Sequence, residues 1–580
     1  MAGELSRAAV PALLALFAAC GAGDAGPEAD AGPEQVREAE RYGGTAVVLL
    51  SGDLQPLNPL MADLRGNLQL HQFALFTPLL RYDAELNPLP GLAERWDTVR
   101  VTPDTLQLTF HLRRDVRWHD GTPTTADDVV FTFQRLKDPR TASPHAEMVR
   151  RYGPRVERID SFTVRFRVRA AADFLVPWMT RPPVPAHLLR DAPPEALSRH
   201  PYGQRPVGNG PFRFVRRVPG QEWVFEANEA YPEALGGRPY LDRVVFRVVP
   251  DATSRLTELL SGSADVAGAP FVRADELRAT PGVRVMAVSD GTWDYVGWNL
   301  RLPLFRDARV RRALALALDR EAIARAVTHG YGRAGRTTVT PIHWSYDDAD
   351  PSLTLPHDPA GAVRLLAGAG WQDRDGDGIV EDASGRPFRF TLKVPAGYAA
   401  YNEAAVIVQA QLRRVGVDAV LQQVELNTLI DQLVGRANAR GGRDRDFEAV
   451  VLGWVDGPFS KDDSQYLHTR VMDEPNGQAG YSNPRADWLM DTLGVTIDRD
   501  AARPLWRELQ RLIALEQPYT VLYYPDALFA VRDRLQGVEM DARGYFISIA
   551  RWWIPPARRG SVRRQDRASA PQPAASPRVF

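Results

Sequence analysis

The sequence predicts an α/β protein built from two lobes, and two observations lead to this prediction. Segments with the period-two alternation of half-buried strands are interspersed with segments whose apolar residues recur at helical spacing. Near the middle of the chain, an aromatic and β-branched stretch from Trp293 to Leu300 gives way to two helical patterns after Asp307. A strand followed by an extended link and two helices suits a chain that leaves one lobe and begins another, with the crossing lining a cleft.

Length and charge exclude several classes of function. The 580 residues are enough for two or three domains, and a hydrophobic content of 44% supplies sizeable cores. The net charge is −1 and the basic residues are almost all scattered arginines, so the chain has no basic footprint for nucleic acid. None of the lysines, Lys137, Lys393 and Lys461, follows a glycine, which excludes the phosphate-binding loop of P-loop ATPases.

The N-terminus carries the pattern of an exported lipoprotein. Residues 7–20, RAAVPALLALFAAC, combine one positive charge, an apolar run of about twelve residues and two alanines before Cys20, the only cysteine. This pattern predicts a signal peptide over residues 1–19 and lipidation at Cys20; the alternative is a buried thiol in an N-terminal helix. Composition predicts a disordered, lipidated tether over residues 20–42 and a disordered tail over residues 558–580.

In the first lobe, residues 45–51 predict a buried strand, and residues 106–112 and 162–168 alternate as half-buried strands do. Between them, VRWHDGTPTTADDVVFTFQRL (residues 116–136) predicts a turn and then a helix capped by Thr125, with Asp128 at capping-box spacing. The glycines of RPVGNGPFRF (residues 205–214) predict a tight turn with positive φ. Residues 253–267 predict a helix ended by Gly262 and a short strand.

In the second lobe, Asp307 and Asp319 are predicted to cap successive helices, the second ending at Gly330. In the first of them, Arg309, Arg311 and Arg312 are kept off the apolar stripe. Further predicted elements are helices over residues 359–369 and 403–415, a buried strand over 447–453, and strands over 519–524 and 528–531 that return toward the first lobe.

An acidic loop in the second lobe partly resembles a calcium site. Asp373, Asp375, Asp377 and Gly378 fit the start of a calcium-binding loop, because alternate carboxylates can converge on a hard cation. The twelfth position of that pattern requires a bidentate Glu but is Ser384, and Glu381 compensates only in part. We therefore predict a solvated turn and no metal site.

The stretch YVGWNLRLPLFRDARVRRALALALDREAI (residues 295–323) resembles the family 5 extracellular solute-binding proteins, the peptide and nickel receptors of bacterial ABC importers. Residues 116–136 and 205–214 match other parts of the family pattern, and QPLNP (residues 55–59) is similar to its first cleft loop. The resemblance extends from about Leu57 to Gly537. It implies a two-lobed periplasmic-binding-protein-like fold (type II) with an extra mixed α/β subdomain in the first lobe.

The resemblance also implies limits for the parts of the chain. The first lobe is expected over residues 43–294, with the subdomain inserted at about 59–203. The second lobe is expected over residues 295–524, and residues 525–557 would return to the first lobe. Two or more crossings between lobes would make a hinge, because each connection absorbs closure by a few backbone torsions.

The implied ligand-binding residues come from three segments. Trp293, Tyr295 and Asn299 lie on the crossing strand, Asn58 lies in the first cleft loop, and Trp454 would form a cleft wall. Trp454 follows Gly453, and this Gly-Trp pair matches the family pattern. In peptide-binding members of the family, an aspartate of the loop after the Gly-Trp pair binds the amine of the ligand. Here the loop lacks the family's Asp-Pro, so the partner is Asp456, Asp462 or Asp463, or these acids are surface charges.

The function implied is that of the extracytoplasmic binding component of an ABC importer, which captures oligopeptides or similar small solutes by lobe closure and delivers them to permease subunits. Such a protein is expected to be a monomer without catalytic activity or cofactor, exported to the periplasm or outer cell surface and anchored to the membrane by lipid. A nickel-chelate receptor using His468 or His119 is one alternative. A secreted hydrolase of peptides or glycans is the other.

Overall fold

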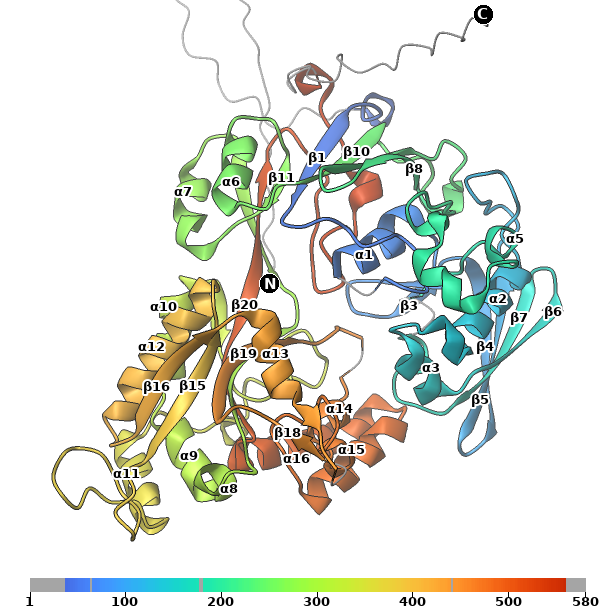
Figure 1. Ribbon diagram of the computed structural model, residues 1–580. Coiled ribbons are helices and arrows are strands. Elements are labelled where there is room, and N and C mark those ends of the chain that lie inside the picture. Colours follow the sequence, from blue (N-terminus) through green and yellow to red (C-terminus); the bar gives the residue numbers. More distant parts are fainter. Residues whose placement is uncertain (1–36, 63–64, 177–180, 440–441, 460, 560–580) are drawn as a thin grey trace, which may run out of the picture.

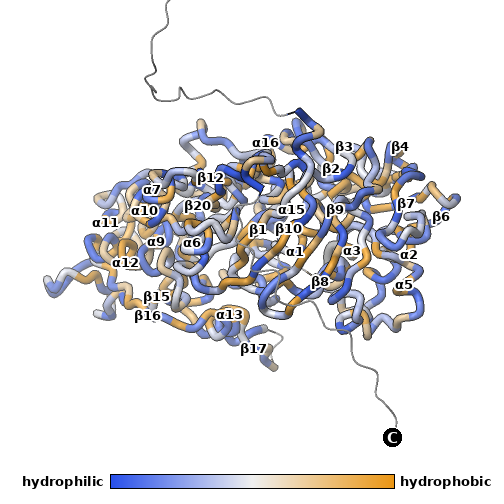
Figure 2. The backbone as a smooth tube through the Cα atoms, turned by 90° about the horizontal axis from the view of Figure 1, so that it is seen from above, coloured by the Kyte–Doolittle hydropathy of each residue, from blue (hydrophilic) through white to orange (hydrophobic). Residues whose placement is uncertain are grey.

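The computed structural model describes residues 37–62, 65–176, 181–439, 442–459 and 461–559. They form the predicted two-lobed α/β fold, which is elongated when seen from above, with α11 (Pro359–Gly368) and α12 (Ala399–Arg413) at one end and α2 (Ala126–Lys137) at the other (Figures 1 and 2). The predicted signal peptide, Cys20 and nearly all of the predicted tail lie outside the described residues.

One sheet of twelve strands runs through both lobes (Figure 1). The strands in the first lobe are β1 (Thr45–Leu50), β8 (Phe212–Val218), β9 (Glu222–Ala227), β10 (Arg243–Val248), β11 (Val266–Gly268) and β12 (Val283–Ser289). The strands in the second lobe are β13 (Thr292–Trp298), β14 (Gly332–Ala334), β15 (Arg389–Pro395), β16 (Asp418–Val424) and β19 (Ala449–Val455). The long strand β20 (Tyr519–Arg532) belongs to both lobes.

Helices cover this sheet in each lobe. Those of the first lobe are α1 (Arg65–Leu70), α6 (Ala252–Leu260) and α7 (Ala274–Ala279). Besides α11 and α12, the second lobe has α8 (Pro303–Arg306), α9 (Ala308–Leu316), α10 (Arg320–Thr328), α13 (Leu426–Val434), α14 (Ser464–Leu467), α15 (Pro484–Val495) and α16 (Arg499–Glu516), and the short hairpin β17 (Arg436–Ala437) and β18 (Arg443–Asp444). Within the described residues, no helix has the length and apolar character needed to cross a membrane.

The predicted caps of the two helices after the crossing are confirmed. The carboxylate of Asp307 accepts a hydrogen bond from the backbone N–H of Arg309 at 2.8 Å, and that of Asp319 accepts one from Ala322 at 2.9 Å. The prediction that all three arginines of α9 avoid its buried face is wrong for Arg311. This residue is buried, and its guanidinium donates to the carbonyl oxygens of Phe305 and Glu516, both at 2.7 Å, which offsets the cost of burying the charge.

The inserted subdomain is built on an antiparallel sheet of four strands, β4 (Ala93–Thr102), β5 (Thr105–Leu112), β6 (Arg155–Asp160) and β7 (Thr163–Arg169). It also contains α2, α3 (Ala146–Tyr152), α5 (Ala186–Leu189) and the hairpin of β2 (Leu80–Tyr82) and β3 (Pro88–Pro90). The predicted alternation along β5 and β7 is confirmed, and α2 begins with the predicted capping box of Thr125 and Asp128.

The glycine-rich turn before β8 has a different cause from the one predicted. Neither Gly208 nor Gly210 has a positive φ. A Cβ at Gly208 would lie 1.9 Å from the carbonyl oxygen of Leu75, and one at Gly210 would lie 2.6 Å from the carbonyl carbon of the same residue. These positions require glycine because another backbone segment passes against them.

Two extended segments connect the lobes side by side. The strands β12 and β13 follow one another along the same side of β20, and they are separated only by Asp290 and Gly291. The first half of β20 pairs with β13 and its second half with β12. Pairing therefore changes from one lobe to the other at residues 290–291 and 524–526, close to the predicted limits at 294 and 524, which stay predictions.

Candidate functional site

A cavity of about 70 Å³ lies where the inserted subdomain of the first lobe meets α15 and α16 of the second lobe. Its apolar wall includes Met490, Leu493, Trp506 and Leu509. Its charged side includes Arg151 and Asp173 of the first lobe and Asp462 and Arg499 of the second. An apolar wall facing a few convergent polar groups is typical of a ligand site, and the volume is below the roughly 300 Å³ of a small-molecule pocket, so a ligand must enter while the lobes are further apart.

The apolar wall follows from the amphipathic pattern of α16. The helix begins at the cap Asp498, whose carboxylate accepts a hydrogen bond from the N–H of Ala501 at 2.8 Å. Apolar residues then recur at helical spacing, and Ala502, Trp506, Leu509 and Ile513 are all buried. The stripe packs in the core of the second lobe and presents part of its surface to the cavity.

The lobes contact each other beside this cavity. The guanidinium of Arg151, on α3, forms ion pairs with Asp173 of its own lobe at 3.3 Å and with Asp462 of the other lobe. The backbone N–H of Ala172 donates to the carbonyl of Gly494 at 3.2 Å across the same boundary. The structure is therefore a closed arrangement of the two lobes.

The predicted aromatic residues come together behind the cavity. Trp293 and Tyr295 are fully buried, because β13 is a central strand flanked by β19 and β20. The ring of Trp293 lies 5.0 Å from that of Tyr295 and 6.0 Å from that of Tyr466, and the half-buried ring of Trp454 stacks on Tyr466 at 5.6 Å. Among the residues predicted from the sequence, the candidate amine partners Asp462 and Asp463 line the cavity.

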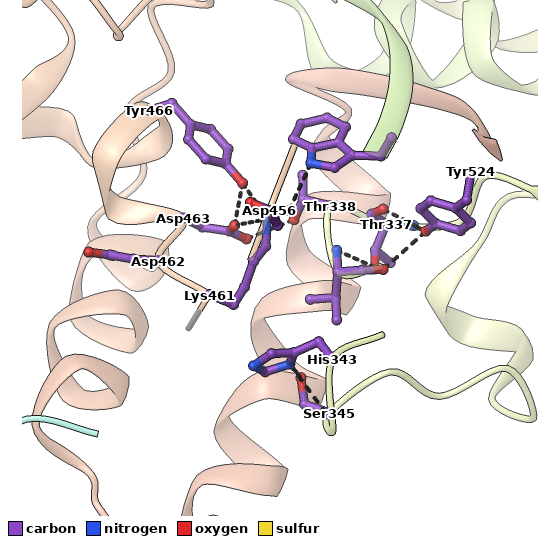
Figure 3. Close-up of polar contacts among 12 residues, drawn as sticks. Thr337, Thr338, His343, Ser345, Asp456, Lys461, Asp462, Asp463, Tyr466 and Tyr524 are labelled. Carbon is purple, nitrogen blue, oxygen red and sulfur yellow. Dashed lines mark hydrogen bonds and ion pairs between the residues drawn. The ribbon is translucent and has the colours of Figure 1, made fainter. Parts of the chain in front are cut away.

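Asp456 has a partner within the chain. Its carboxylate accepts hydrogen bonds from the indole N–H of Trp293 at 2.8 Å and from the ammonium of Lys461 at 2.6 Å (Figure 3). The same ammonium forms an ion pair with Asp463 at 2.8 Å and donates to the hydroxyl of Tyr466 at 2.6 Å. The acidic loop after Trp454 thus folds around a buried lysine.

The two predicted asparagines hold backbone turns. The side-chain amide of Asn299 donates to the carbonyl of Phe447 at 3.0 Å, and its oxygen accepts from the N–H of Arg301 at 3.3 Å. Asn58 is buried in the first lobe, where its oxygen accepts from the N–H of Leu60 at 3.1 Å. The structure does not bring either asparagine to the cavity wall described above, and their ligand-binding role stays a prediction.

Comparison with known proteins agrees with this architecture. The profile of the family described as bacterial extracellular solute-binding proteins, family 5 Middle, matches residues 87–473. This chain is a family 5 extracellular solute-binding protein. It is 30% identical over 522 residues, 89% of the chain and 92% of the relative, to the oligopeptide-binding protein AppA of Bacillus subtilis. It is 28% identical over 488 residues, 79% of the chain and 82% of the relative, to the heme-binding protein A of Haemophilus influenzae.

The fold of this solute-binding protein is also similar to a solved structure. The structure of AppA from Bacillus subtilis in complex with a nonapeptide superposes with a TM-score of 0.73 at 29% sequence identity and covers 89% of this chain and 99% of that one. The predicted recognition of the family and the predicted fold class are therefore confirmed.

The histidines proposed for a nickel chelate are engaged elsewhere. His119 is held by the Gly208–Gly210 turn, where its ring nitrogens contact the N–H of Gly208 at 3.1 Å and the carbonyl of Gly210 at 3.0 Å. Burial lowers the pKa of His119 to about 4. His468 lies against Asp487 and Asp491, with nitrogen–oxygen distances of 3.4 and 3.3 Å. Neither histidine lines the cavity between the lobes.

Among the described residues, the acidic loop at 373–381 carries a group of side chains that could bind a metal ion. Ligand atoms of Asp373, Asp375, Asp377 and Glu381 lie within 4.8 Å of one another. Their carboxylates already accept backbone hydrogen bonds of the turn, for example from Gly376 to Asp373 at 2.7 Å. The predicted solvated turn stays a prediction.

Three important residues of the site were not singled out from the sequence. Arg151 carries no local signal, and the amphipathic pattern around Trp506 indicates burial but not a cavity. Both residues reach the cavity only through the packing of the two lobes. Lys461 could have been noticed, since it is one of three lysines in a chain that otherwise uses arginine and it stands beside two aspartates.

Proposed function

We propose that this protein is the substrate-binding component of an ABC importer, and that it captures oligopeptides or comparable small solutes between its lobes. The observation that carries the proposal is the cavity between the lobes, with an apolar wall on one side and charged groups of both lobes on the other. The similarity to a protein named as oligopeptide-binding supports this ligand class. The protein delivers its ligand unchanged to permease subunits and acts as a monomer.

Closure of the lobes is the signal that such a receptor gives. The lobes are joined by the β12–β13 connection and by β20, so a change of a few torsions near Gly291 and Pro525 opens or closes the cavity. A ligand that contacts both lobes favours the closed state, because only differential affinity shifts this equilibrium. The apolar wall accepts an apolar side chain of the ligand, and the charged side meets its polar backbone.

The first prediction tests the cavity by truncating Trp506 on its apolar wall. Ligand carried through purification is identified by mass spectrometry, and the stripped protein is titrated with it by calorimetry. We expect Trp506→Ala to weaken binding by about 1–3 kcal/mol, the cost of removing an aromatic contact. The control is Trp488→Ala, because this tryptophan of α15 is 48% exposed and packs on Arg485.

Equal losses of affinity in the two tryptophan variants would show that the ligand lies elsewhere.

Incubation of the wild-type protein with a peptide library distinguishes a receptor from a secreted hydrolase. A receptor retains peptides intact, whereas new cleavage products that scale with protein concentration would contradict the proposal.

The second prediction concerns export and anchoring. We propose that Cys20, at the end of the apolar N-terminal run, carries a lipid that holds the protein at the periplasmic or outer face of a membrane. Cys20→Ala should move the protein from the membrane fraction to the soluble exported fraction or leave it unprocessed, because acyl chains supply about 0.8 kcal/mol of membrane affinity per buried CH₂. Unchanged membrane retention of Cys20→Ala, in cells that process other lipoproteins, would contradict the anchor.

A further inference from the structure

The ammonium of Lys461 fills a closed polar cage. Its three hydrogens have three acceptors, namely the carboxylates of Asp456 at 2.6 Å and Asp463 at 2.8 Å and the hydroxyl of Tyr466 at 2.6 Å. The nitrogen also lies 5.3 Å from the ring centres of Trp293 and Tyr466, within the range of cation–π attraction. The side chain is only 1% exposed.

Neighbouring groups fix the walls of this cage. The indole N–H of Trp293 donates to Asp456 at 2.8 Å, and the hydroxyl of Thr338 donates to Asp463 at 2.7 Å (Figure 3). The hydroxyl of Tyr466 also donates to Asp463. A connected network of this kind holds its members in place, so the cage is an ordered receptor for an ammonium group.

The charges explain why Lys461 stays in the cage. Burial alone would lower the pKa of Lys461, but Asp456 and Asp463 outweigh burial and raise that pKa above its ordinary value. Lys461 is therefore charged at neutral pH. Removing it would leave two buried carboxylates without a cation, which is strongly unfavourable.

We infer that Lys461 is a specificity-determining residue, a built-in occupant of an ammonium cage that keeps the amino group of a ligand away from Asp456 and Asp463. Lys461 and Asp463 also line the cavity between the lobes, so the filled cage lies directly beside the proposed ligand site. A ligand there meets the ion pairs of Arg151 with Asp173 and Asp462 instead of an open pair of carboxylates. The inference deepens the proposed function, on which its consequence for the ligand rests.

The test empties the cage and offers a free ammonium ion. Lys461→Ala removes three methylene groups and the ammonium, which together correspond to n-propylammonium. We expect Lys461→Ala to lower the Tm by several degrees, and n-propylammonium chloride at about 50 mM to restore about half of that loss by binding the folded state. The same concentrations of n-propanol and sodium chloride should restore much less, because neither supplies an alkyl chain with a charged head.

Lys393→Ala is the matched control. Lys393 is also buried, and its ammonium donates to the amide oxygen of Gln432 at 2.9 Å and to the carbonyl of Asp446 at 2.6 Å. It forms only one ion pair, at 3.2 Å with the carboxylate of Asp446, and that carboxylate is 77% exposed, so the site is not a closed cage. We expect little rescue of this variant. Equal rescue of both variants, or no more rescue of Lys461→Ala by n-propylammonium than by sodium chloride, would overturn the inference.

A second measurement uses the wild-type protein and therefore does not depend on the folding of a variant. Because the chain has three lysines, lysine labelled with ¹⁵N at the ammonium gives a simple NMR spectrum. The buried ammonium of Lys461 should give a slowly exchanging signal that about 50 mM n-propylammonium leaves unchanged. Displacement of that signal would show that external ammonium enters the cage. Neither measurement uses a peptide, so failure of the cage and failure of the proposed function remain distinguishable.

Discussion

Asp294 is a buried carboxyl group in the middle of the sheet. It lies on β13 close to the crossing between the lobes and is 4% exposed. Burial raises its pKa from 3.8 to about 7, and this outweighs the nearby hydroxyls of Tyr523 and Tyr401, which favour the charged form. The folded protein therefore holds a proton that the unfolded chain releases at a much lower pH.

The third prediction follows from this raised pKa. Between about pH 4 and pH 7 the unfolded state binds fewer protons at Asp294 than the folded state, so stability falls as the pH rises through this range. Asp294→Asn imitates the protonated form and should remove this contribution. Urea unfolding should therefore show a gain of stability for Asp294→Asn over wild type that is a few kcal/mol larger at pH 8 than at pH 4.

The control for this prediction is Asp275→Asn, because the side chain of Asp275 is 94% exposed. Its effect on stability should be small at both pH values. A difference between Asp294→Asn and wild type that does not change with pH would mean that Asp294 is ionised in the folded protein.

Some single residues have a role that depends on tertiary contacts and could not be predicted from the sequence. The Gly-Trp pair before the acidic loop was recognised by resemblance, but the reason for Gly453 appears only in the structure. A Cβ there would lie 2.3 Å from a carboxylate oxygen of Asp294 and 2.8 Å from the hydroxyl of Tyr401. In the same way, the sequence left Asp456, Asp462 and Asp463 as alternatives, because ion pairs with Lys461 and Arg151 depend on tertiary packing.

At the scale of elements, local patterns predicted strands and helices well. The alternation in β5 and the capping box of α2 are properties of adjacent residues, so the sequence shows them directly. The strands that flank a given strand, in contrast, come from distant parts of the chain. The sequence could not show that β19 and β20 flank β13 and bury Trp293 and Tyr295. The two strands predicted over residues 519–524 and 528–531 are parts of the single strand β20.

The fourth prediction concerns the acidic turn of residues 373–381. Both carboxylate oxygens of Asp373 accept backbone hydrogen bonds, from Gly376 at 2.7 Å and Gly378 at 3.1 Å, and Glu381 accepts one from Arg374 at 2.9 Å. A calcium ion would compete with these bonds and would lack the bidentate ligand of a strong site. Calcium at about 1 mM should therefore raise the Tm by less than about 2 °C in differential scanning calorimetry.

Magnesium at the same concentration is the control for ionic strength. A stabilisation by calcium that is much larger than that by magnesium and is reversed by a chelator would show that the four carboxylates form a calcium site.

At the scale of the whole molecule, the fold could be predicted because the resemblance extends over most of the chain. The division of the hydrophobic core into two groups of residues agrees with the predicted two-lobed fold. One group of core residues draws on residues 46–277 and 530–554, and another on residues 293–524. The cavity could not be predicted in the same way, since its walls come from Arg151 and Asp173 on one side and from α15 and α16 on the other.

The fifth prediction is that Arg151 helps to hold the lobes closed. Its side chain is 24% exposed, and its guanidinium joins Asp173 of the first lobe to Asp462 of the second, so its loss leaves two partly buried carboxylates facing each other. Arg151→Ala should shift the ligand-free protein toward the open state. Because only the closed fraction binds tightly, a tenfold smaller closed fraction, about 1.4 kcal/mol, would weaken the apparent affinity about tenfold.

Opening is measured as the distance between labels on Val99→Cys in the first lobe and Val420→Cys in the second, both exposed positions, in a chain in which Cys20 is replaced. Arg140→Ala is the control, because Arg140 pairs with Asp138 on the same exposed turn and touches only its own lobe. Saturating ligand should restore the short distance in Arg151→Ala, since binding energy is then available to close the lobes. An unchanged distance distribution in the ligand-free variant would mean that closure depends on the hinge strands and the Ala172–Gly494 contact rather than on this ion pair.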